Sequence, residues 1–168
     1  MRRAAYLAVV VTLAFGLAAP AATAQPTNFR AVLSGAEEVP ARDTQARGVA
    51  KFKLSADGSE LAFKIVVANI ENVFAAHIHC GAPGVNGPVG VTLFMGTPAS
   101  GPVNGELESG TITAPDPGNG CGWTDLAAVV AAIESGNTYV NVHTNDGDAT
   151  PNEGPGDFPG GEIRGQVF

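Results

Sequence analysis

Short segments of alternating polar and apolar residues, separated by glycine, proline and asparagine, follow one another from Asn28 to the end of the chain. Because side chains of a β-strand alternate between two faces, this pattern is typical of an antiparallel sandwich or barrel. The Asp57-Gly58 pair predicts a tight hairpin between the second and third strands. The predicted strands are Asn28–Leu33, Gly48–Leu54, Leu61–Ala68, Val73–Cys80, Val89–Met95, Glu106–Ile112, Thr138–Thr144 and Glu162–Phe168.

One segment departs from the strand pattern. Thr124–Ser135 contains alanine, leucine, valine and isoleucine without strict alternation. Thr124 is of a type that caps helix N-termini, and Gly136 is of the type that ends helices. The sequence therefore predicts one short helix in a mostly β chain.

The first 24 residues have the three parts of a secretory signal. Arg2 and Arg3 supply positive charge, Ala4–Leu17 is an apolar run, and Ala22-Thr23-Ala24 is a cleavage pattern. The apolar run is shorter than the roughly 20 residues that a membrane-spanning helix needs. We therefore expect residues 1–24 to be removed and residues 25–168 to form one exported domain, periplasmic or extracellular, without a membrane anchor.

Charge limits the classes of partner. The full chain has a formal net charge of −7, and residues 25–168 keep seven basic and all sixteen acidic residues, a net charge of −9. Such a surface is expected to repel the phosphates of nucleic acids and of anionic lipids. The predicted partner is instead an exported protein or a metal ion.

Cys80 and Cys121 are the two cysteines of the chain. In an exported protein a pair of cysteines favours a disulfide. Closing a loop of about 40 residues would stabilise the fold by roughly 3–4 kcal/mol through chain entropy. Two unpaired buried thiols are the alternative, and the sequence alone leaves it open.

Polar side chains gather on one face of three predicted strands. His77 and His79 lie opposite the apolar face of their strand, and the same alternation places polar residues together in the strands that begin at Thr138 and Glu162. If the three strands are neighbours, their polar faces merge. The residues that would share this surface are His77, His79, Tyr139, Asn141, His143, Glu162, Arg164 and Gln166.

This arrangement predicts a metal site formed by His77, His79 and His143. A His-x-His pair places two imidazoles on one strand face about 6.5–7 Å apart at their Cα atoms, and a third from a neighbouring strand completes a three-nitrogen site. Imidazole ligands suit copper or zinc. Tyr139 or Glu162 would be a fourth ligand or a supporting residue. The alternative is three solvent-facing histidines without an ion.

Two loops carry further candidate chemistry. Gly81–Pro88 has glycines at three-residue spacing, but a strand follows it, so a tight loop is favoured over a phosphate site. The irregular stretch Asn145–Gly161 holds the acidic residues Asp146, Asp148 and Asp157, for which a solvated acidic loop is favoured over a calcium site. Because this stretch follows His143 directly, we expect it to cover or gate the histidine face.

Several stretches resemble the CHRD domain, the module of chordin that is common in exported bacterial proteins. They extend over most of residues 29–168 and include Leu33–Pro40, Ala75–Gly81 with Gly87–Val89, Tyr139–Thr144 and Gly161–Gln166. The resemblance implies an immunoglobulin-like β fold and a module of undefined biochemical role. It also shows one departure, the insertion Asn145–Pro159, where family members have a short turn.

Three functions compete on these observations. The first is an exported binding module that holds copper or zinc, and the second is a metal-free structural or protein-binding domain. The third and weaker one is a copper-dependent redox enzyme, since the His-x-His strand is also similar to copper-zinc superoxide dismutases, which use more histidines than the three present here. No catalytic residues are predicted, because the chain has no Gly-x-Ser-x-Gly elbow.

Overall fold

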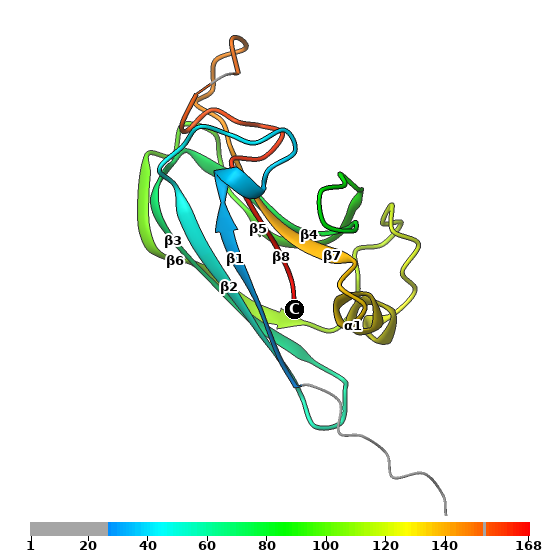
Figure 1. Ribbon diagram of the computed structural model, residues 1–168. Helices are drawn as coiled ribbons and strands as arrows, with labels where there is room; N and C mark the ends of the chain where they lie inside the picture. Colours follow the sequence, from blue (N-terminus) through cyan, green and yellow to red (C-terminus); the bar gives the residue numbers. More distant parts are fainter. Residues whose placement is uncertain (1–26, 153) are drawn as a thin grey trace, which may run out of the picture.

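The computed structural model describes residues 27–152 and 154–168 (Figure 1). The predicted signal segment, residues 1–24, lies outside the described residues. The elements are β1 (Asn28–Ser34), the 3₁₀ turn η1 (Gly35–Glu37), β2 (Arg47–Leu54), β3 (Leu61–Glu71), β4 (Val73–Cys80), β5 (Val89–Met95), β6 (Pro102–Ile112), α1 (Leu126–Glu134), β7 (Thr138–Thr144) and β8 (Ile163–Gln166).

All eight of these strands join one antiparallel sheet, in the order β5-β4-β7-β8-β1-β2-β3-β6. The sheet bends until its outer strands β5 and β6 contact each other, so the fold is nearly a barrel (Figure 1). Register shifts in the β3–β6 and β4–β5 pairs mark β-bulges, which increase local bending. The predicted all-β antiparallel fold with one short helix is confirmed. The two separate sheets of an immunoglobulin-like sandwich are not, because a continuous ladder joins all eight strands.

Strand boundaries follow the alternation closely. β4, β5 and β7 have the predicted limits, whereas β3 and β6 are longer, since their ladder continues beyond a bulge to Glu71 and Pro102. The helix begins at Leu126 because Asp125, not Thr124, caps it: the Asp125 carboxylate accepts a hydrogen bond from the Ala128 N–H at 2.9 Å. Gly136, with φ of +70°, follows the helix as predicted.

The apolar faces of the strands point into the barrel. Leu33, Ile65, Ile78, Val140 and Ile163 are fully buried there, together with one side of α1. Burying each such side chain contributes about 1.5–3 kcal/mol to the free energy of unfolding. No helix in the described part of the chain is long and apolar enough to cross a membrane.

Three loops cover the opposite, polar face of β4, β7 and β8. These strands are neighbours, so their polar faces merge as expected. The face is nevertheless buried: His79 is 8%, His143 7% and Arg164 2% exposed. The covering loops are residues 35–42, 81–88 and 155–161, which contact side chains of this face. The solvent-facing alternative is therefore wrong for His79 and His143.

Candidate metal centre

The three histidines form one cluster. His77 and His79 lie on the same face of β4, and the antiparallel register places Ala75 opposite His143 of β7, so that His143 is diagonal to His77. One nitrogen from each ring lies within 4.8 Å of the other two. Within residues 27–152 and 154–168 this is the one group of three or more histidine, cysteine or acidic side chains close enough to share an ion.

Backbone carbonyls fix the orientation of two of the rings. The Nδ1 atom of His79 lies 2.9 Å from the Gly87 oxygen, and that of His143 lies 3.0 Å from the Pro159 oxygen. Because a carbonyl oxygen only accepts, we assign the proton of both rings to Nδ1, which leaves a lone pair on each Nε2. The Nε2 atom of His79 is buried and has no hydrogen-bond partner.

The spacing of the nitrogens suits a small transition-metal ion. His77 Nδ1 lies 3.1 Å from His143 Nε2. Two ligands at the usual zinc–nitrogen distance in a tetrahedral site are about 3.3 Å apart. The widest separation in the cluster, 4.8 Å, would have to close by about 1.5 Å. The cluster is therefore nearly preformed and needs a small side-chain movement to bind an ion.

Burial keeps the imidazoles neutral. Desolvation lowers the pKa of His77 to about 4, helped by the charge of His79. Desolvation likewise lowers the pKa of His143 to about 4, with a further contribution from His77, and lowers the pKa of His79. A metal ion needs the neutral ring, so all three residues are in the ligand state at neutral pH.

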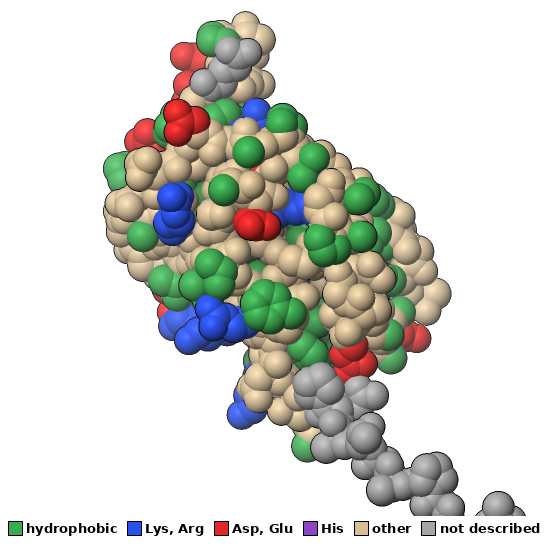
Figure 2. Space-filling view, in the orientation of Figure 1, with side chains coloured by type: hydrophobic (Ala, Val, Ile, Leu, Met, Phe, Trp, Pro, Cys, Tyr) green, Lys and Arg blue, Asp and Glu red, His purple; other side chains and the backbone are tan. Residues whose placement is uncertain are grey.

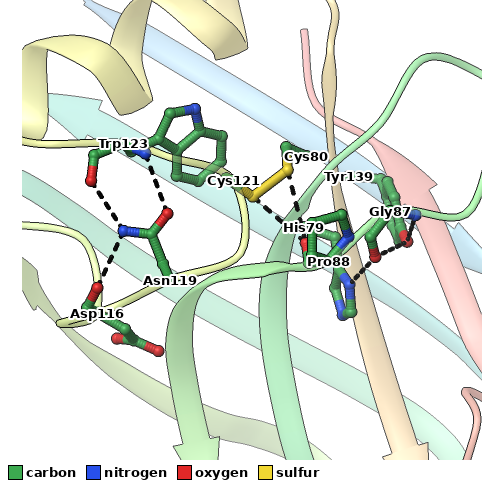
Figure 3. The surroundings of a disulfide bond; sticks show 9 residues. All are labelled: His79, Cys80, Gly87, Pro88, Asp116, Asn119, Cys121, Trp123 and Tyr139. Carbon is green, nitrogen blue, oxygen red and sulfur yellow. Dashed lines mark hydrogen bonds between the residues drawn. A yellow bond between two sulfur atoms is a disulfide. The ribbon is translucent and has the colours of Figure 1, made fainter.

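The disulfide and a close loop contact hold His79 in place (Figure 3). Cys80, next to His79 in β4, is bonded to Cys121, which confirms the predicted disulfide. The 81–88 loop returns so closely that a Cβ on Gly87 would lie 1.6 Å from the Cys80 carbonyl oxygen. Only glycine permits this approach, which places the Gly87 carbonyl against the His79 ring. Gly87 is thus a supporting residue, although its glycine-rich surroundings predict only a tight loop.

Tyr139 forms the next layer of support. Its ring stacks on His79 with centroids 4.8 Å apart, and the Arg164 guanidinium lies 3.4 Å from the ring centroid. The phenol accepts a hydrogen bond from the Gly87 N–H and donates one to the Gly87 carbonyl. Arg164 in turn donates to Asn86 and to the Val85 carbonyl. The stack thus ties β4, β7 and β8 to the loop that orients His79.

A model of the CHRD domain matches residues 29–151. The chain belongs to the CHRD domain family. Comparisons with curated proteins and with solved structures give no match. The match ends inside the insertion Asn145–Pro159, which the sequence analysis identified as a departure from the family pattern.

The insertion of this CHRD domain contacts the cluster through its last residue, Pro159, which accepts the His143 hydrogen bond. Its described acidic residues form no group of three close enough to share an ion. The Asp148 N–H donates to the Asp146 carboxylate, and Asp157 lies apart, 6% exposed. The calcium hypothesis gains no support from this arrangement, and the insertion contacts the histidine cluster at His143.

Glu162 does not belong to the histidine group. Its carboxylate accepts hydrogen bonds from the Thr44 and Thr144 hydroxyls at 2.6 and 2.7 Å and from the Gly156 N–H at 2.9 Å. These contacts tie Thr44 and the 155–161 loop to the end of β7 and to the residue that precedes β8. The geometry therefore favours a structural role for Glu162 over the predicted role of a fourth ligand.

Two further buried groups lie beside the centre. Asn141 is opposite His77 in the ladder, and its Oδ1 atom has no partner. A Cβ on Gly161 would lie 2.4 Å from the Asn141 Nδ2 atom and 2.7 Å from Glu38 Oε1, so both side chains pack against that glycine. Burial raises the pKa of Glu38 to about 7. Glu38 was missed as a candidate because two adjacent glutamates in a loop carry no alternation signal.

Proposed function

We propose that this CHRD domain is an exported binding module that holds one copper or zinc ion through His77 Nδ1, His79 Nε2 and His143 Nε2. The observation that carries the proposal is the unpartnered Nε2 of His79. A buried nitrogen lone pair without a donor costs free energy, and a cation at the centre of the cluster would satisfy it. The Nδ1–H bonds of His79 and His143 to carbonyls are the outer contacts that metal-ligating histidines usually make.

The residues present fit such an ion. Neutral imidazoles are ligands for copper and zinc, and three protein ligands leave one position for water or a small ligand. Tyr139 and Arg164 would fix the His79 ring, and Asn141, opposite His77 in the ladder, would offer an unpaired oxygen. The bound ion would serve metal handling or stabilise an adhesion surface. Export rests on the predicted signal segment and agrees with the disulfide.

One observation favours the metal-free alternative. Without an ion, His77 Nδ1–H donates to His143 Nε2, so two of the three rings satisfy each other. A structural or protein-binding domain would then need the cluster only for packing. The redox-enzyme alternative stays a prediction, since it requires turnover of superoxide or peroxide above that of free copper.

Elemental analysis of the protein purified from the exported fraction tests the proposal. We expect about one copper or zinc per chain, and loss of that metal in a His77→Ala/His79→Ala variant. Protein that carries no metal and whose melting temperature does not change on addition of copper or zinc would support the metal-free domain instead. The Glu37→Gln variant, which changes an exposed side chain, is the matched control.

A further inference from the structure

Exposed basic side chains gather on the outer face of β1, β2 and β3. Figure 2 shows Lys and Arg side chains beside hydrophobic ones on the side of the barrel that carries β2. We call this surface the basic face, and its cations are Arg30, Arg47, Lys51, Lys53 and Lys64. Within the described residues no other basic side chain is fully exposed, since Arg42 is half-buried and Arg164 is buried. In the part of the chain that the structure describes, the fully exposed cations thus lie on one side.

The register places three of these cations in a row. Arg30 is directly opposite Lys51, and Lys51 is directly opposite Lys64. Like charges directly opposite each other on neighbouring strands destabilise a sheet. Lys64 forms an ion pair with Glu106, the one ion pair within residues 27–152 and 154–168. Among the described residues neither Arg30 nor Lys51 forms an ion pair, and an anion would relieve their repulsion.

A parallel row of valines lies beside the cations. Val32, Val49 and Val66 are opposite one another in the same ladders, and Val32 and Val66 are 47% and 40% exposed. The space between the two rows is hollowed. One hollow, of about 270 Å³, is lined by Val49, Lys51, Lys64 and Val66, and others of about 490 and 280 Å³ lie on the same face. Separate hollows with partly apolar linings thus lie across the strands next to the line of positive charge.

We propose that the basic face binds an anionic polysaccharide, a linear chain of carboxylated or sulfated sugars lying across β1, β2 and β3. Neighbouring strands are about 4.8 Å apart, so the cation row presents a charge at short, regular intervals across the sheet. The acidic groups of the sugar chain would contact Arg30 and Lys51. The apolar C–H surfaces of the sugar rings would lie on the valines.

The observations favour a single anionic polysaccharide chain over a membrane or a nucleic acid. Residues 25–168 carry a net charge of −9, so a flat anionic surface such as a membrane would also approach the acidic residues around the basic face and be repelled by them. A single narrow chain would contact the basic face alone, and charges farther away than about one screening length would act on it only weakly. The two rows contain no aromatic residue, and one exposed aromatic side chain, Phe168, lies beside Arg30, with whose backbone it exchanges two hydrogen bonds. Insertion at a membrane interface uses belts of Trp and Tyr, and stacking of successive bases uses several aromatic side chains, so a single Phe beside the rows favours neither partner.

Binding of the full exported protein to a polyuronate and to dextran sulfate tests this proposal. Uncharged dextran of equal length is the ligand control, and a chelator in the buffer keeps the histidine cluster out of the result. We expect binding in about 0.05 M NaCl that is lost in about 0.5 M NaCl. The Arg30→Gln/Lys51→Gln variant should bind about 25-fold more weakly, since each cation near an anionic surface contributes about fivefold.

A matched variant separates the basic face from net charge alone. Ala127→Glu/Ala131→Glu makes the same change of two charge units on the exposed side of α1 and should leave binding within about twofold. Equal weakening in both variants, or no binding to either polysaccharide, would overturn the proposal. Binding to anionic vesicles or single-stranded DNA in place of the polysaccharides would overturn the assigned partner. The Arg30→Gln/Lys51→Gln variant should melt no lower than the native protein, because it removes a repulsion.

Discussion

His77 Nδ1 lies 3.1 Å from His143 Nε2, while the opposite nitrogen of the His143 ring is held by the Pro159 carbonyl. In the absence of a metal, one hydrogen atom between the two rings satisfies both nitrogens. A metal ion would take its place, and the His77 proton would move to Nε2. The same two nitrogens therefore serve a hydrogen bond in one state and a metal ion in the other.

Metal affinity should persist to low pH. Protons compete with the ion only when the rings titrate, and the pKa values of His77 and His143 are about 4 in the folded protein. We expect the affinity for zinc to be nearly constant from pH 8 to about pH 5 and to fall as the pH approaches 4. Calorimetric titration in a non-coordinating buffer measures this. A midpoint near the ordinary histidine value of about 6.5 would contradict the buried geometry.

The metal-free protein should lose stability in acid. Because His77 and His143 have a lower pKa when folded than when unfolded, the unfolded state binds protons first as the pH falls below about 6.5. Each would then reduce the free energy of unfolding by about 1.4 kcal/mol per pH unit, as an upper limit, until the pH reaches about 4. Urea denaturation between pH 7 and 4.5 measures the slope. A flat profile in the chelated protein would show that the rings are not desolvated.

Glu38 should act in the opposite direction. Its carboxyl has a raised pKa of about 7 when folded, so the folded state holds this proton more tightly and loses stability as the pH rises from about 4.5 through 7. Glu38→Gln should therefore raise the free energy of unfolding at pH 8, by up to about 3 kcal/mol, and change it little near pH 4.5. Glu37→Gln, at the exposed neighbouring position, is the control. An equal effect of both variants at pH 8 would rule out the burial cost at Glu38.

Gly87→Ala should weaken metal binding more than it weakens the fold. The added Cβ would lie 1.6 Å from the Cys80 oxygen, so the loop must move and His79 would lose its carbonyl partner. Loss of such a partner lowers metal affinity about 10- to 100-fold. Gly84→Ala, in the same loop, has a positive φ and no atoms within 4 Å of the added Cβ. It should cost stability without changing affinity. Equal zinc affinities of the two variants would remove the role assigned to the Gly87 carbonyl.

The disulfide should stabilise both the fold and the site. Cys80 and Cys121 are 41 residues apart, and closing such a loop contributes about 4 kcal/mol through chain entropy. We expect Cys80→Ser/Cys121→Ser to lose about this much in urea denaturation and to bind zinc more weakly, because β4 ends at Cys80 beside His79. Native stability in the double variant would show that the loop is held by other contacts.

The strands and the histidine face were predictable because both rest on period-two alternation. That rule placed His77, His79 and His143 on the polar faces of their strands. The strand order β4-β7-β8 then brings these polar faces together. It did not predict that the polar face is covered, because burial there comes from loops whose position depends on contacts such as Gly87 with Cys80. Glu162 shows the same limit: its position was predicted, but its partners Thr44 and Thr144 were not.

The net charge of residues 25–168 does not show how the charges are distributed over the surface. A total of −9 suggests a uniformly repulsive surface, yet the cations are segregated on the basic face. The signal was present in the spacing of Arg47, Lys51 and Lys53, which occupy alternate positions of one strand. Only the register with β1 and β3 shows that Arg30 and Lys64 extend this line across the sheet.

Anomalous diffraction from crystals of the protein equilibrated with zinc or copper tests the central claim most directly. The account predicts one strong peak about 2.0–2.1 Å from His77 Nδ1, His79 Nε2 and His143 Nε2. A cluster without a peak while the ion appears elsewhere, for example on the acidic residues of the insertion, would contradict it.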